Sequence, residues 1–231
     1  MQHPPINLAM SSSRRAWLVA AGAVAGAAAL PLFAQRRAAP GAAAPAGDAS
    51  AAAQPSTIGP FPADKDRVFF FFQFSCGFSS MVHQAVADWA ATLPPSIRFT
   101  KIHVAINDED LAAIAAHAAV RTALPKRLHE FERRAFDAIQ QGARYDAQAT
   151  YARVIRQLNE PVKLAKEQQG KMISRVMRAG QLSANYKVLV VPSFGIGGAL
   201  VLNANHTGGD YQALIALVNG AVSRLLPGEL K

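Results

Sequence analysis

The hydrophobic pattern begins with a strand–helix–strand unit. Residues 67–74 form a short, continuous aromatic run that has the length and composition of a buried strand. Residues 79–92 follow helical periodicity, and Pro94 ends that helix. Its apolar face would carry Met81, Val82, Ala85, Val86 and Trp89. Residues 97–106 alternate as a second strand, so we predict a right-handed crossover and a parallel pair.

A helical block follows, from about residue 108 to about residue 185. It is rich in Ala, Gln, Arg and Lys and short of glycine, and its amphipathic stripes predict about four helices. We interpret these stripes as core packing. They are Tyr151, Val154, Ile155 and Leu158, then Leu124, Leu128 and Phe131, then Ile173, Val176 and Met177 leading towards Leu182.

Strand character returns near the C-terminus. Two apolar runs, 188–196 and 199–202, flank the pair Gly197-Gly198, a pattern typical of a β-hairpin. A last amphipathic helix opens at Gly208-Gly209-Asp210 and carries Leu214, Leu217, Val218 and Val222. We therefore predict an α/β protein with the element order of a thioredoxin-like fold and an inserted helical domain.

The N-terminal part does not look like part of this fold. Residues 1–34 pair Arg14 and Arg15 with an uncharged, Ala-rich run, which predicts a cleaved signal peptide similar to the twin-arginine export signature. The alternative that this segment is retained as a membrane anchor is left open, because the run is nearly long enough to span a bilayer. Residues 35–64 are rich in Ala, Pro, Gly and Ser and predict a disordered linker. We expect a folded domain over 65–231, located in the periplasm.

Composition and charge exclude several classes of protein. The chain is 51% hydrophobic and 17% charged, which fits a packed domain better than a disordered one. The net charge of +9 comes from basic residues that are scattered singly or in pairs, so we expect no nucleic-acid binding. One cysteine excludes an intramolecular disulfide and a Cys-rich metal site. His117, His129 and His206 lack metal-ligand spacing, so we expect no metal.

The single cysteine, Cys76, lies where the aromatic strand ends and the first helix begins, with Ser75 as the expected N-cap. Unpaired N–H groups and the helix dipole favour the thiolate there, and the thiolate is the nucleophile. We predict a catalytic thiol, with a small buried side chain as the alternative. His83 lies about 10 Å further along the helix axis, too far to act as a base. We interpret His83 and His103 as structural.

From about residue 67 to residue 226 the chain resembles the DsbA-type thiol–disulfide oxidoreductases. The similarity comprises the aromatic strand into Cys76, the strand FTKIHV (99–104), the helical insertion, and Val191-Pro192 before the hairpin. The resemblance implies a cis-proline at 192, cysteine-containing protein substrates and a redox partner that the sequence leaves unidentified. It implies catalytic roles for Cys76, Ser79 and Pro192, and substrate contacts for Gly77, Phe78 and Val191.

Departures from that family change the expected chemistry. Its Cys-x-x-Cys motif is here Cys76-Gly77-Phe78-Ser79, so a cycle of mixed disulfides through one thiol remains, with Ser79 as a hydrogen-bond donor to the sulfur. Phe70 stands where the family often has an acidic residue. This reading needs no cofactor, and the direction of electron flow stays open.

Two alternatives remain beside the DsbA-like oxidoreductase. The motif CGFS is similar to that of monothiol glutaredoxins, which bind glutathione and can bridge a [2Fe–2S] cluster, and Gly208-Gly209-Asp210 resembles their glutathione-holding segment. The other alternative is a non-catalytic thioredoxin-fold module that binds extended peptides beside Pro192.

Overall fold

The computed structural model describes residues 54–105, 109–141 and 146–225, apart from the side chain of residue 109. They belong to one compact unit. The predicted signal peptide and most of the predicted linker lie outside them. The elements are β1 (Ser56–Thr57), β2 (Arg67–Phe72), α1 (Gly77–Ala91), β3 (Arg98–His103), α2 (Glu109–Ala123), α3 (Leu128–Gln140), α4 (Ala147–Arg156), α5 (Lys166–Asn185), β4 (Ser193–Ile196), β5 (Leu200–Asn203) and α6 (Tyr211–Ser223).

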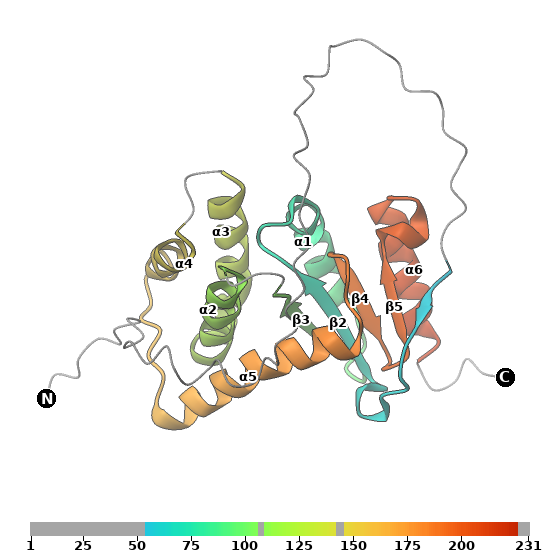
Figure 1. The fold of residues 1–231 in the computed structure, drawn as a ribbon, viewed down its shortest axis with the longest axis horizontal. Helices are drawn as coiled ribbons and strands as arrows, with labels where there is room; N and C mark the ends of the chain where they lie inside the picture. The colour runs from blue at the N-terminus through green and yellow to red at the C-terminus, as the bar shows by residue number, and fades with distance from the viewer. Residues whose placement is uncertain (1–53, 106–108, 142–145, 226–231) are drawn as a thin grey trace, which may run out of the picture. The chain divides into compact units, whose positions relative to one another are not determined.

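The strands form one five-stranded sheet in the order β1-β5-β4-β2-β3 (Figure 1). β2 and β3 run parallel, with α1 as the crossover helix, as predicted. β4 and β5 form the predicted antiparallel hairpin, and β4 also pairs antiparallel with β2. The fold is therefore thioredoxin-like, and α2 to α5 are the four helices expected between its two halves.

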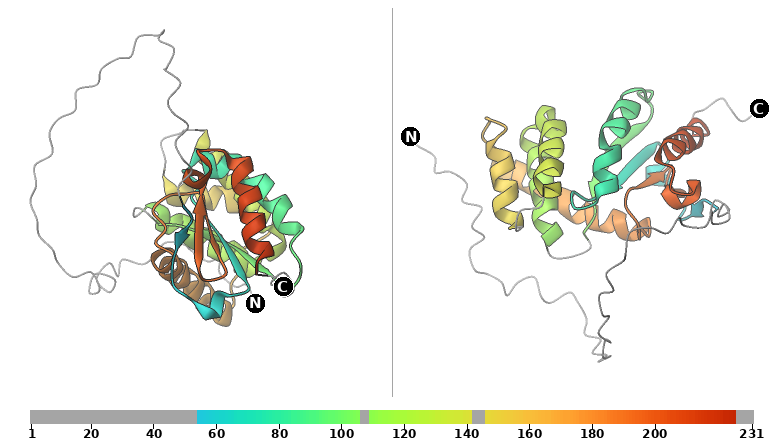
Figure 2. Two further views of the ribbon diagram at one scale, coloured as in Figure 1. Left: turned by 90° about the vertical axis from the view of Figure 1, so that its right-hand side faces the viewer. Right: turned by 90° about the horizontal axis from the view of Figure 1, so that it is seen from above.

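The helices cover both faces of the sheet and extend past one edge. Buried residues of α1 and α6 pack on one face, and those of α5 pack on the other. α2, α3 and α4 gather beyond β3, and α5 runs from them back under the sheet (Figures 1 and 2). None of the helices within the described ranges is long and apolar enough to cross a bilayer.

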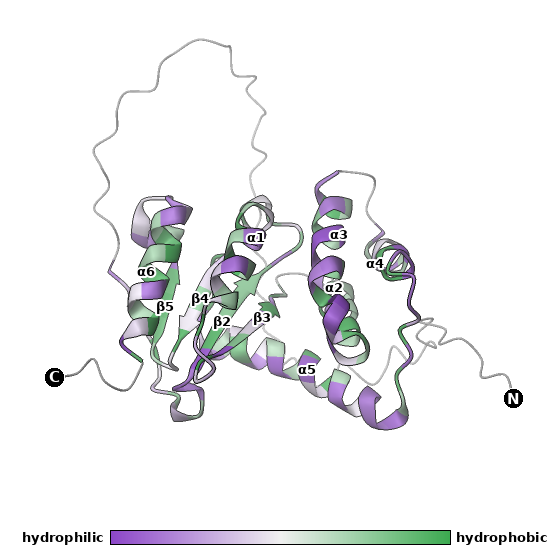
Figure 3. Ribbon diagram, turned by 180° about the vertical axis from the view of Figure 1, so that it is seen from behind, coloured by the Kyte–Doolittle hydropathy of each residue, from purple (hydrophilic) through white to green (hydrophobic). Residues whose placement is uncertain are grey.

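The aromatic run forms the centre of the core. Phe70, Phe72 and Phe74 pack on the side of α1 and α6, whereas Phe69 and Phe71 pack on the side of α5, and all five are almost fully buried. Alternate side chains of a strand point to opposite faces, so a strand buried on both faces shows no polar alternation. Figure 3 shows mostly hydrophobic strands and an α5 with hydrophilic and hydrophobic bands.

The predicted linker extends too far towards the C-terminus. β1 pairs with β5 at the edge of the sheet, and the Ile58 N–H donates to the Ala199 carbonyl at 2.8 Å. Phe61 stacks on Tyr186 with 5.7 Å between ring centroids, and Asp64 is buried. The ordered domain therefore begins before Lys65. Composition does not reveal this segment, because main-chain hydrogen bonds hold its strand.

Helical periodicity places some apolar residues on the wrong face. Met81, Ile173 and Met177 are 68%, 47% and 56% exposed, so they are not core residues. α1 instead buries His83 next to Val82, because His83 has a polar partner inside the protein. Ala85 is also exposed, and 188–191 is irregular chain rather than strand.

Gly195 in β4 leaves no room for a side chain. An added Cβ would lie 2.4 Å from two ring carbons of Tyr186 and 3.0 Å from the ring of Phe71. We expect Gly195→Ala to lower the free energy of unfolding by roughly 1–3 kcal/mol through overpacking, measured by urea denaturation of the full chain. Gly220→Ala in α6, where an added Cβ meets nothing within 4 Å, is the control and should be neutral or stabilising. Equal losses in both variants would contradict this expectation.

Candidate functional site

Cys76 is itself the N-cap of α1. Its Sγ accepts a hydrogen bond from the Ser79 N–H at 3.4 Å, and the helix begins at Gly77. The prediction of Ser75 as the cap is therefore wrong by one residue, because the thiol takes the place of a capping hydroxyl. The half-buried sulfur lies among the free N–H groups of a helix N-terminus, the position from which its reactivity was inferred.

The loop before β4 brings Val191 against the thiol. The Val191–Pro192 peptide bond is cis, as the resemblance implied. The Cys76 thiol donates to the Val191 carbonyl at 3.4 Å, although the two residues are 115 positions apart. Among the described residues, the Val191 N–H has no hydrogen-bond partner. The thiol therefore lies against the residue before the cis-proline, the arrangement that the resemblance implied.

Ser79 occupies the position of the family's second thiol and is fully buried. Its backbone N–H bonds to Cys76, but its hydroxyl does not, which differs from the expected hydroxyl–sulfur bond. The hydroxyl has no hydrogen-bond partner within the part of the chain that the structure describes. The first turn of α1 therefore contains a buried, unbonded side-chain oxygen where a second sulfur would stand.

Exposed apolar side chains lie close in the chain either to Cys76 or to its contact residue Val191, and we call them the apolar rim. They are Phe78 and Met81 in the first turns of α1, and Leu189 and Val190 directly before Val191. Phe78 is 54% exposed and stacks on Tyr211 with 5.2 Å between ring centroids. Burial, and after it the negative charge at Cys76, raises the pKa of Tyr211. A rim of this kind is typical of a binding surface.

A buried charged cluster joins α1, β3, α2 and α3, and the sequence analysis missed it. The Glu132 carboxylate accepts from Lys101 at 2.6 Å and lies 2.9 Å from one ring nitrogen each of His83 and His117. Burial alone would raise the pKa of Glu132, but the hydrogen bonds from His117 and His83 and the charges of His117 and Lys101 hold it well below its usual value. The carboxylate is therefore ionised.

A signal for this cluster was present in the sequence. Glu132 follows Leu128 by four residues and Phe131 by one, so it lies on the apolar face of a predicted helix. A carboxylate on such a face needs buried partners, because an unpaired charge is costly in a protein interior. Local spacing could not identify those partners, since they come from three other elements.

Three members of this region have the geometry of a possible metal site. Ligand atoms of His83, His129 and Glu132 all lie within 4.8 Å of one another, which the spacing of the histidines along the chain did not indicate. The Lys101 ammonium, however, lies 2.6 Å from Glu132 and 3.1 Å from His83. We therefore interpret the group as an ion-pair cluster, and the absence of a metal remains a prediction.

His103 lies at the end of β3, and only one of its ring nitrogens is paired. Nε2 accepts from the Phe74 N–H at 3.2 Å, whereas Nδ1 has no partner among the residues described. Burial, and then the neighbouring His117, lowers the pKa of His103 to about 3. The ring is therefore neutral near pH 7, and because Nε2 accepts, Nδ1 carries the proton. The interpretation of His103 as a structural histidine with its hydrogen bonds satisfied is therefore correct for Nε2 only.

The segment Gly208-Gly209-Asp210 forms the start of α6. Gly208 and Gly209 have φ values of 61° and 91°. The Asp210 carboxylate accepts from the N–H groups of Gln212 at 2.8 Å and Ala213 at 3.0 Å. This aspartate acts as a helix cap, and nothing in the described residues favours a glutathione site there.

No protein-family model matches this chain, and no curated protein matches its sequence. Solved structures of DsbA proteins do match it. The DsbA disulfide interchange protein of Klebsiella pneumoniae is 19% identical with a TM-score of 0.58, over 73% of this chain and 95% of that one. Pseudomonas aeruginosa DsbA is 15% identical with a TM-score of 0.61, over 74% and 91%.

A third match carries a ligand. Proteus mirabilis DsbA, in complex with the non-covalently bound peptide PWATCDS, is 16% identical with a TM-score of 0.58, over 74% of this chain and 96% of that one. At these identities the likeness concerns the fold. The described chain has the fold of the DsbA proteins, a thioredoxin fold with an inserted helical domain.

The buried His103 predicts a pH dependence of stability. In the unfolded chain the residue titrates near 6.5, and in the folded protein its pKa is about 3. Between these values the unfolded state binds a proton that the folded state excludes, so stability is lost as the pH falls. We expect His103→Gln to reduce the slope of unfolding free energy by roughly 1 kcal/mol per pH unit between about pH 6 and pH 4. Equal slopes in urea denaturation of both proteins would refute this.

Proposed function

We propose that this chain is an exported thiol–disulfide exchange protein that acts through Cys76 alone. The observation that carries the proposal is the position of that thiol, which caps α1 and donates to the Val191 carbonyl beside a cis-proline. The matching solved structures are named as DsbA proteins, and the one from Klebsiella pneumoniae as a disulfide interchange protein. The fold and the local geometry of the thiol support the same chemistry.

The exchange would proceed in two steps. The Cys76 thiolate attacks one sulfur of a substrate disulfide, a new S–S bond joins the two proteins, and the other substrate sulfur leaves as a thiolate. A second thiol then attacks the mixed disulfide and restores the Cys76 thiolate. When this thiol belongs to the substrate, its disulfides are rearranged. When it belongs to a redox partner, the partner becomes joined to the substrate sulfur as Cys76 leaves. A second thiol of that partner must then release the substrate, so that the substrate disulfide is reduced by two electrons and the two partner thiols become a disulfide.

Ser79 makes the second step depend on another molecule. A hydroxyl cannot attack a disulfide as a thiolate does, and the single cysteine leaves the chain without an internal resolving group. The mixed disulfide would therefore persist until an outside thiol arrives. This property suits rearrangement of substrate disulfides, or retention of a partner, better than rapid donation of a disulfide.

Val191 would provide the main-chain contacts for a substrate. Its N–H is free among the described residues, and its carbonyl is occupied by the thiol proton. When Cys76 ionises or forms a mixed disulfide, that proton is lost and the carbonyl also becomes available. A free donor and acceptor beside the nucleophile suit an extended peptide, which binds by adding main-chain hydrogen bonds. The Proteus mirabilis neighbour holds a cysteine-containing peptide.

Export rests on the sequence of the first 34 residues. Arg14 and Arg15 before an uncharged run support transfer to the periplasm, with the segment either cleaved or kept as a membrane tether. An oxidising compartment suits exchange chemistry with protein disulfides. Cysteine-containing proteins are the proposed substrates, and the second thiol would come from a separate redox partner.

Single substitutions at Cys76 and Ser79 test the proposed disulfide exchange. We expect the full chain, incubated with a peptide disulfide, to accumulate a mixed disulfide that intact-mass measurement detects, and Cys76→Ser to form none. In Ser79→Cys the added thiol attacks the adduct, because it stands one helical turn from Cys76, so the adduct should fall roughly tenfold. Ser174→Cys, at an exposed position on α5, is the control for an extra thiol elsewhere. If wild type forms adduct no faster than a cysteine-containing peptide, only a binding module remains.

The apolar rim gives a separate prediction for substrate binding. In a Cys76→Ser background, Phe78→Ser should weaken binding of the peptide PWATCDS roughly fivefold or more, because an exposed aromatic anchor is lost. Ile173→Ser, an equally exposed apolar site on α5, should leave binding unchanged. Fluorescence anisotropy of the labelled peptide measures both. Equal effects of the two substitutions would show that the apolar rim does not contact the peptide. That result would not bear on whether Cys76 exchanges disulfides.

A further inference from the structure

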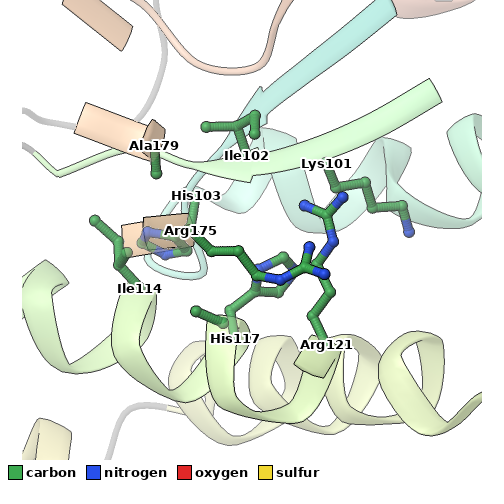
Figure 4. A pocket seen from close by; sticks show the side chains of 9 residues that line it. Lys101, Ile102, His103, Ile114, His117, Arg121, Arg175 and Ala179 are labelled. Carbon is green, nitrogen blue, oxygen red and sulfur yellow. The ribbon is translucent and has the colours of Figure 1, made fainter. Parts of the chain in front are cut away.

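A pocket between β3, α2 and α5 is lined by basic side chains (Figure 4). It is open to solvent, and about 270 Å³ between and in front of its lining side chains is empty, open solvent included. Its polar lining comprises Lys101, His103, His117, Arg121 and Arg175. None of these residues belongs to the thiol site, and the exchange chemistry proposed above does not use the pocket.

Arg121 and Arg175 reach into this pocket from α2 and α5 without a carboxylate partner. Neither forms an ion pair with any residue in the described ranges, and Figure 4 shows their guanidinium groups near one another. Burial, and then the positive charge of Arg175, lowers the pKa of Arg121, with Glu132 acting in the opposite direction. Two half-buried guanidinium groups that repel each other are stabilised by an anion between them.

The local charges do not cancel. Lys101, Arg121 and Arg175 supply three positive charges at the pocket, and Glu132 supplies one negative charge that Lys101 already pairs with. Two positive charges are therefore left without a carboxylate among the described side chains. Arg127 and Arg134, by contrast, both form ion pairs with the Glu130 side chain.

His103 supplies an independent observation at the same place. It is only 2% exposed, it lines the pocket, and its Nδ1–H makes no well-aligned hydrogen bond among the residues described, although the Val104 backbone lies near enough to raise the pKa of the ring. Buried donors are nearly always paired, with protein, water or a ligand. The donor on β3 and the two guanidinium groups on α2 and α5 would therefore be satisfied by the same kind of partner, an oxygen acceptor.

We propose that this pocket binds a small oxyanion, whose oxygens accept hydrogen bonds from Arg121, Arg175 and the Nδ1–H of His103. The forked guanidinium group matches the paired oxygens of a carboxylate or a phosphate. The enclosed space is little larger than one water molecule needs, so an anion would enter with one or two oxygens and keep the rest of its group in solvent. The ligand is therefore a single oxyanion, or the anionic end of a longer molecule.

The pocket is connected to the active-site loop through one ring. Nε2 of His103 accepts from the Phe74 N–H, and Phe74 lies two residues before Cys76. An anion that accepts from Nδ1–H makes Nε2 a stronger acceptor, because hydrogen bonds in a chain polarise one another. Occupancy of the pocket would therefore stabilise the loop that carries the thiol.

Thermal unfolding of the full chain tests this site. Sodium phosphate and sodium acetate are titrated at matched ionic strength against sodium chloride, with wild type, Arg121→Gln, Arg175→Gln and the control Arg156→Gln. Arg156 is exposed on α4 and lies outside the pocket. Once the concentration of the binding anion exceeds its Kd, we expect each further tenfold increase to raise the Tm of wild type and of the control by about 3 °C or more. This increase is measured relative to sodium chloride at the same ionic strength. Both pocket variants should lose most of that gain.

The two salts identify the ligand chemistry. A response to phosphate alone assigns a phosphate or similar tetrahedral group, and a response to acetate assigns a carboxylate; either supports the site. No gain over chloride, or the same gain in all four proteins, overturns it. Should a variant fail to fold, the His103 Nδ1–H resonance of wild type gives the answer. It must shift as the anion is added, and an unchanged resonance refutes the proposal.

Discussion

The burial of β2 on both of its faces determines where everything else in the molecule lies. Because Phe70 and Phe72 need cover on one side and Phe69 and Phe71 on the other, the strand must run inside a sheet with helices above and below. Phe74 continues the run beyond the strand and packs against Phe131, Phe136 and Tyr151 of the inserted helices. The same aromatic stretch therefore holds both the sheet and the insertion.

Strand direction explains why the thiol and the cis-proline meet. β4 runs antiparallel to β2, and Phe71 pairs with Ser193, so the end of one strand lies beside the start of the other. Cys76 follows the first strand and Val191-Pro192 precedes the second. The adjacent ends of these two inner strands bring together residues that are far apart in the chain. The chemistry of the site thus follows from topology, and the exposed rim adds the surface a substrate would contact.

The sequence predicted the parts of the structure that depend on local patterns. The aromatic run, the parallel crossover, the Gly197-Gly198 hairpin and the position of Cys76 at a helix start all follow from periodicity and turn residues. What it could not predict depends on contacts made across the fold. The pairing of Ser56 with Val201 uses only main-chain atoms, and the partners of Glu132 come from three separate elements.

The Glu132 cluster has a consequence for how the molecule can move. Lys101 and His83 belong to the thioredoxin part, whereas Glu132 and His117 belong to the inserted helices, and the carboxylate is buried between them. Separating the two parts would leave an ionised carboxylate without partners, at a cost of about 3–5 kcal/mol. Gln140, which donates to the Phe74 carbonyl at 2.9 Å, adds a second link. Hinge opening between the helices and the sheet is therefore strongly disfavoured. A peptide of the kind proposed above would have to be accommodated by rearrangement of surface side chains.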